Sequence, residues 1–181
     1  MAIGYYFRQA RRFVEEISDD DREKLTALCR SIQRAEARLL DAAAPLMETC
    51  AAHCRGLCCR NIQLDAVIGR GDLVYILALN PRLAPEMAAC LENEPLLYAA
   101  DCIFLKNGVG PCIFPDTLKP DVCLTTFCED TAAVAREIRQ VKRRFMRLDL
   151  FITLDGLRRL ARFFGNRLRL TSHSSQNRNV Q

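Results

Sequence analysis

Ten cysteines in a chain of 181 residues constrain its fold more than any other feature. Eight of them fall into two groups, whereas thiols that serve only as small apolar packing side chains would be scattered through a core. Cys29 and Cys90 stand among apolar residues at helical spacing, and we expect both to belong to the core. The eight grouped thiols are candidate metal ligands: Cys50, Cys54, Cys58, Cys59, Cys102, Cys112, Cys123 and Cys128.

The expected compartment decides how these thiols are interpreted. The N-terminal residues contain no apolar core of a targeting peptide. The longest apolar run, Leu73–Leu79, is far shorter than the roughly 20 residues of a membrane-spanning helix. We therefore expect a cytoplasmic protein without a membrane partner. Thiols stay reduced in that compartment, so clustered cysteines indicate metal or redox chemistry rather than disulfides.

The spacing of the first group favours an iron–sulfur cluster over zinc. Four thiolates complete either a tetrahedral zinc site or a [4Fe–4S] cluster. Zinc sites often use paired C-x2-C motifs, but the gaps here contain three, three and no residues. Zinc remains the alternative, and His53 could replace one thiolate. The side chains of Cys58 and Cys59 must diverge, so one is a spare thiol or the two serve different sites.

Apolar periodicity predicts a mainly α-helical fold packed around a small cysteine-rich metal centre. Asn107-Gly108 allows one short β-hairpin between residues 100–105 and 111–114. We expect an N-terminal helical segment (1–48), a cysteine-cluster core (49–129), basic C-terminal helices (130–170) and a disordered tail (171–181). The expected helices cover residues 4–17, 19–44, 72–79, 85–91, 130–148 and 154–165, with a helical turn within 120–127. Pro45 is expected to interrupt the second of them.

Charge is distributed unevenly along the chain. Residues 131–170 contain 11 Lys/Arg and 3 Asp/Glu, whereas residues 1–130 contain 14 and 19. A basic end could bind an acidic protein partner. We do not expect nucleic-acid binding, because aromatic residues do not alternate with the arginines as a base-stacking surface requires. A solvated helix face is the simplest interpretation of the same charges.

Electron transfer or redox sensing is the function that the thiols favour. The alternative is a zinc-stabilised structural or interaction module that binds protein or nucleic acid through its basic C-terminal helices. No Ser–His–Asp group, carboxylate pair or phosphate-binding loop indicates an enzyme. Cys50-x3-Cys54 begins like the motif of radical S-adenosylmethionine enzymes. The next gap does not fit that motif, however, and the chain is short for their barrel. We therefore do not expect the chain to be an enzyme on its own.

The cysteine pattern resembles that of the CxxCxxCC (YkgJ-type) family, whose members are described as zinc- or iron-chelating. The resemblance rests on Cys50-AAH-Cys54-RGL-Cys58-Cys59, and then on Cys102-IFL, Gly110-Pro111-Cys112-IFP and Lys119-Pro120-Asp121-Val122-Cys123-LTTF-Cys128. It covers less than half of the chain and implies that the eight thiols are metal ligands. Here the first gaps are three residues rather than two, Phe114 replaces a usual Tyr, and Lys119 replaces a usual Arg. A similar cluster in flagellin lysine methylases is associated with an iron–sulfur centre, but those chains are considerably longer.

Overall fold

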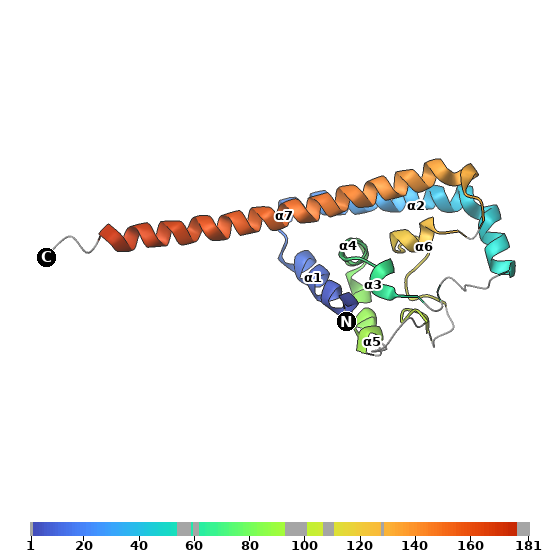
Figure 1. Cartoon of the computed structure of the whole chain (residues 1–181), viewed down its shortest axis with the longest axis horizontal. Helices are drawn as coiled ribbons and strands as arrows, with labels where there is room; N and C mark the ends of the chain where they lie inside the picture. The colour runs from blue at the N-terminus through green and yellow to red at the C-terminus, as the bar shows by residue number, and fades with distance from the viewer. Residues whose placement is uncertain are drawn as a thin grey trace. The chain divides into compact units, whose positions relative to one another are not determined.

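All regular secondary structure in the described part of the chain is helical, as the sequence predicts (Figure 1). The computed structural model describes residues 2–53, 59, 62–92, 101–106, 111–127 and 129–176, without the side chains of residues 2, 49–53 and 162–176. The chain divides into two units, Met1–Leu148 and Asp149–Gln181, which are described separately. Among the described helices, none has the length and apolar character needed to cross a lipid bilayer.

Helix α1 (Ala2–Glu16) forms because its apolar residues recur every three or four positions. These side chains are buried, and they continue into the residue that follows the helix. The buried positions are Ile3, Phe7, Ala10, Phe13 and Ile17. They form the face of α1 that packs against α4 (Arg70–Leu79).

Helix α2 (Asp19–His53) begins at a strong sequence signal. The hydroxyl of Ser18 accepts a hydrogen bond from the amide of Asp21 at 3.4 Å, and three aspartates occupy the first turn. The predicted end at Pro45 is wrong, because the helix continues to His53. A proline removes one hydrogen bond and bends a helix without always ending it. Figure 1 shows the last turns of α2 bending away from the preceding ones.

Helix α4 forms the centre of the first unit. Every residue from Gly71 to Leu77 is buried, and the helix packs against both α1 and α2. Tyr75 reaches the buried carboxylate of Glu36 on α2, and its ring meets the ring of Phe145 edge-on at 5.3 Å. Tyr75 therefore joins α4 to α2 and to the first turns of α7 (Ala135–Gln176).

Short elements connect this helical core to the cysteine-rich segments. They are α3 (Leu64–Val67), the 3₁₀ turn η2 (Pro81–Leu83), α5 (Ala84–Glu92), α6 (Asp121–Thr125) and the 3₁₀ turn η4 (Ala132–Val134). The predictions for α4, α5 and α6 are confirmed within two residues at each end. The described residues contain no strand. An isolated antiparallel bridge joins Leu105 to Cys112, and the predicted turn at Asn107-Gly108 lies outside the described residues.

The C-terminal helices differ from the prediction, because α7 is one helix from Ala135 to Gln176 rather than two. Gly156 does not break it, since a glycine within a helix costs only about 1 kcal/mol. Residues 171–176, expected to be disordered, are helical, and residues 177–181 lie outside the described part. In the second unit, Arg159 pairs with Asp155 at 2.6 Å. Leu157 and Leu160, two apolar residues of the expected helix 154–165, are exposed.

Candidate metal centre

The two cysteine groups of the sequence meet through a backbone hydrogen bond. The amide of Cys102 donates to the carbonyl oxygen of Cys59 at 2.8 Å. Forming this contact closes a loop of about 40 residues, which costs conformational entropy. Both residues are half-buried, so their thiols lie near the surface of the first unit.

Two further hydrogen bonds fold the segment around Cys112 back onto the segment around Cys102. The amide of Ile113 donates to the carbonyl oxygen of Phe104, and the amide of Lys106 donates to that of Pro111, both at 2.9 Å. The rings of Phe104 and Phe114 are buried with their centroids 4.8 Å apart. This aromatic pair anchors the turn in the core and leaves Cys112 half-buried.

Cys123 belongs to α6, whose position is set by Asp72 on α4. One carboxylate oxygen of Asp72 accepts a hydrogen bond from the amide of Asp121, and the other accepts one from the amide of Gly69, each at 2.8 Å. The carboxylate therefore caps the first turn of α4 and holds α6 beside it. This role of Asp72 is not among the sequence predictions, although an acid at the third position of a helix is a known capping signal.

The pKa shifts of Cys102 and Cys123 indicate that these thiols lie within electrostatic range of one another. Burial, together with the nearby Cys112, Cys59 and Cys90, raises the pKa of Cys102 to about 11, although a backbone hydrogen bond from Phe104 opposes the rise. Desolvation and the neighbouring Cys102, Cys112 and Cys59 also raise the pKa of Cys123, which remains accessible to solvent. Thiolates within electrostatic range of one another repel, and a bound cation would offset that repulsion.

Cys90 does not lie in the core, contrary to its interpretation from the sequence. It is half-buried on α5, and burial, Glu86 and Cys112 raise its pKa. Met87, one turn earlier on the same helix, fills the core instead. Apolar neighbours in the sequence could not show that Met87 is buried and Cys90 only half-buried, because Cys90 lies at the edge of the buried face of α5. Cys29 is buried in α2 as predicted, and burial raises its pKa to about 12.

The structure describes only part of the predicted ligand set. Cys54, Cys58 and Cys128 lie outside the described residues, and Cys50 and His53 belong to the last turns of α2 without described side chains. Four candidates are therefore described with their side chains: Cys59, Cys102, Cys112 and Cys123. Within this described part, no three His, Cys, Asp or Glu side chains are close enough together to hold a metal ion.

Comparisons with protein-family models, curated proteins and solved structures find no match to this chain. The resemblance to the CxxCxxCC family therefore stays a prediction from the cysteine motifs.

Proposed function

We propose that this protein holds a metal–thiolate centre, an iron–sulfur cluster in the first instance, and that it transfers electrons or senses redox state. The observation that supports the proposal is the hydrogen bond from the amide of Cys102 to the carbonyl oxygen of Cys59, which joins the backbones of the two cysteine groups. The ligands would come from Cys59, Cys102, Cys112 and Cys123 together with the candidates outside the described residues.

The chemistry of the donor set fits such a centre. Thiolates are the ligands that iron–sulfur clusters and structural zinc share. Binding would release the thiol protons and would couple to folding, because the ligands come from segments about 40 residues apart. The half-buried setting of Cys102 and Cys112 would limit the access of water, which is one of the factors that set the potential of an iron–sulfur cluster.

Metal analysis of anaerobically purified protein tests the proposal. We expect a brown protein with iron and acid-labile sulfide in equal amounts and with broad visible absorption. Stoichiometric zinc without iron would reject the iron–sulfur centre and favour the zinc-stabilised module instead. A protein that contains neither metal, even after reconstitution with iron and sulfide or with zinc, would overturn the proposal as a whole.

Cysteine variants test which thiols are involved. Cys102→Ser and Cys123→Ser should each lower the metal content, whereas Cys29→Ser should retain it because Cys29 is buried in the helical core. Circular dichroism of each variant distinguishes metal loss from unfolding. Equal metal loss in a folded Cys29→Ser variant would contradict the assignment. The metal content of a Cys90→Ser variant would show whether this fifth thiol also binds the metal.

A further inference from the structure

The first turns of α7 present a row of arginines in a groove of about 380 Å³. Their spacing of three or four residues places them along one side of the helix. All of them belong to the first unit of the chain. The residues lining this groove are Arg136, Arg139, Gln140, Arg143, Arg144 and Arg147.

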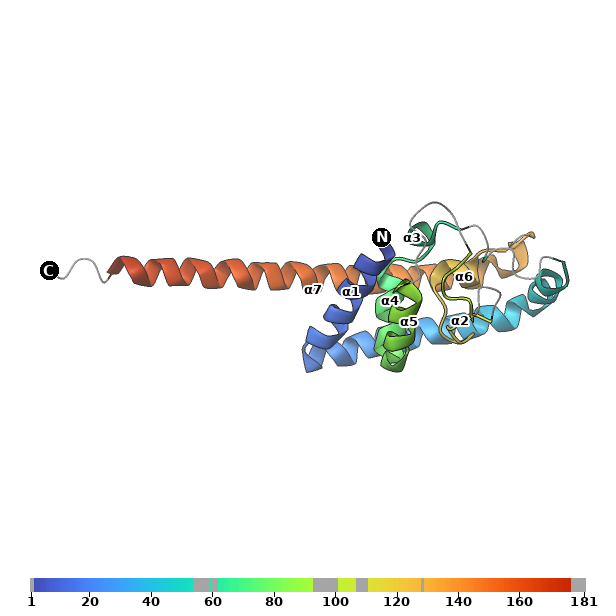
Figure 2. The same cartoon turned by 90° about the horizontal axis from the view of Figure 1, so that it is seen from below.

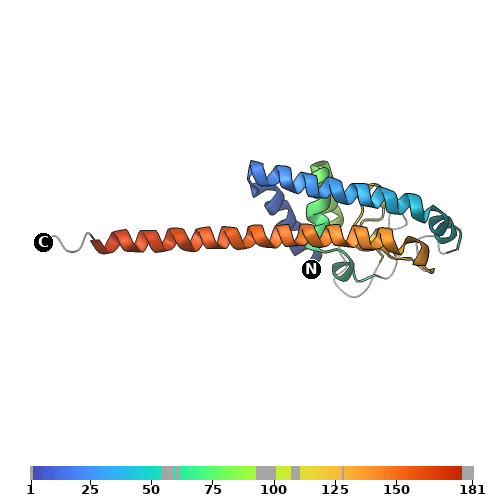
Figure 3. The same ribbon diagram turned by 90° about the horizontal axis from the view of Figure 1, so that it is seen from above.

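Arginines of α2 extend this surface across a second helix. Figure 2 and Figure 3 show α2 beside the first turns of α7, running in the opposite direction. Desolvation lowers the pKa of Arg144, and so do the nearby charges of Arg38, Arg147, Arg34 and Arg143. The two rows are therefore electrostatic neighbours. We define the arginine face as Arg34 and Arg38 of α2 with Arg139, Arg143, Arg144 and Arg147 of α7.

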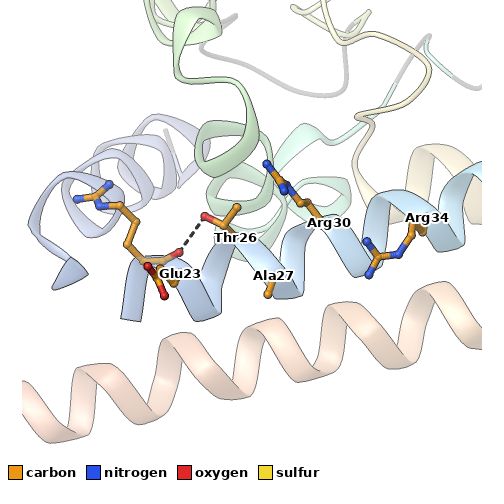
Figure 4. A pocket seen from close by; sticks show the side chains of 6 residues that line it. Glu23, Thr26, Ala27, Arg30 and Arg34 are labelled. Atoms are coloured by element: carbon orange, nitrogen blue, oxygen red, sulfur yellow. Dashed lines mark hydrogen bonds between the residues drawn. The ribbon is translucent and has the colours of Figure 1, made fainter. Parts of the chain in front are cut away.

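A second groove, of about 450 Å³, continues from the arginine face along α2. Figure 4 shows Arg30 and Arg34 among the side chains that line it, and Arg34 also belongs to the arginine face. Glu23 is the single carboxylate among the described residues that line the two grooves. The basic surface thus continues along α2 from Arg34 through Arg30 to Arg22.

The charge of this face is not balanced within the described part of the chain. The ion pairs of the described residues join other side chains, such as Arg11 with Glu15 and Arg12 with Glu16 on α1. No ion pair among the described residues involves a member of the arginine face. Like charges three or four residues apart on one helix repel one another, so a bound anion would stabilise this face.

We propose that the arginine face is a docking surface for an acidic segment of a partner protein, with carboxylates repeated at helical spacing. Guanidinium groups bind carboxylates through two parallel hydrogen bonds. Arg139, Arg143 and Arg147 follow one another at about 6 Å intervals along α7, the spacing of acids four residues apart on a partner helix. The arginine face is distinct from the cysteine centre. It would bind the partner protein with which the centre exchanges electrons.

Two other classes of polyanion fit the surface less well. No aromatic side chain lines either groove, so bases of single-stranded nucleic acid would find no stacking surface. An amphipathic helix that lies on a membrane buries large apolar side chains beside its basic ones. Ala27 is the only apolar residue among those lining the two grooves, and Met146 is the single large apolar side chain exposed on the described first turns of α7.

Fluorescence anisotropy with defined probes tests the proposal. The main probe is a labelled synthetic helix with glutamates every third or fourth residue on one face, and its control is a peptide of equal composition with glutamates on all faces. A DNA duplex and phosphatidylserine vesicles are the competing probes. We expect the patterned peptide to bind most tightly at about 50 mM salt and to weaken as salt rises.

Matched charge variants make the result specific. Replacing Arg139, Arg143 and Arg147 by glutamine should weaken peptide binding about five- to tenfold. Replacing Arg8, Arg11 and Arg12 on α1 removes the same charge and should weaken it less than twofold. Equal weakening by both variants, tighter binding of the duplex or vesicles, or no binding of the patterned peptide would each overturn the proposal. Metal content, measured in parallel, tests the cysteine centre independently.

Discussion

The buried carboxylate of Glu36 should make the stability of this protein fall as pH rises. Glu36 has 0% exposed surface, and the hydroxyl of Tyr75 donates a 2.5 Å hydrogen bond to one of its oxygens. The other oxygen has no hydrogen-bond partner within the described part of the chain. Burial, opposed by the Tyr75 hydrogen bond and reinforced by Asp72 and Asp121, raises the pKa of Glu36 from 4.5 to about 8.

The sign and the size of the effect follow from proton linkage. Between pH 4.5 and 8, Glu36 is protonated in the folded protein and ionised in the unfolded chain. The folded state therefore binds more protons, and the free energy of unfolding falls by about 1.4 kcal/mol per pH unit. Across the whole window the loss reaches roughly 5 kcal/mol. Above pH 8 both states are ionised, so stability stops changing through this group.

The Glu36→Gln variant isolates this contribution, because its side-chain oxygen can still accept the Tyr75 hydrogen bond. Urea unfolding, followed by circular dichroism at several pH values, measures the free energy of unfolding. At pH 5 this free energy should differ between the variant and the wild type by less than about 1 kcal/mol. By pH 8 the variant should be more stable by several kcal/mol. Asp41→Asn, which changes an exposed acid on the same helix, is the control. A difference between Glu36→Gln and wild type that does not change with pH would refute the reasoning.

Two further substitutions test the elements that position the cysteines. Asp72→Asn replaces one of two accepting oxygens with a donor, so either Gly69 or Asp121 loses its partner, and urea unfolding should show a loss of about 1–3 kcal/mol. Wild-type stability of this variant would contradict the capping role. Phe104→Ala empties a fully buried aromatic site and should cost about 3–5 kcal/mol in the same assay, whereas a loss below 1 kcal/mol would mean that the pair with Phe114 does not anchor the turn.

Local signals in the sequence were sufficient for most of the helices. Apolar periodicity and the Ser18 capping signal predict α1 and the start of α2, because both depend on residues within a few positions. Two local inferences failed. Pro45 bends α2 without ending it, and α7 continues through Gly156, because a single unfavourable residue costs less than a long helix gains.

Only the tertiary structure decided which distant residues meet. It joined the backbones of Cys59 and Cys102, and it brought Cys90 within electrostatic range of Cys112 and Arg34 of α2 within electrostatic range of Arg144 of α7. The identity of eight candidate thiols comes from the sequence alone, and their role as metal ligands stays a prediction. Such long-range contacts depend on how the helices pack and on the closure of long loops. Neither is encoded in the spacing of neighbouring residues.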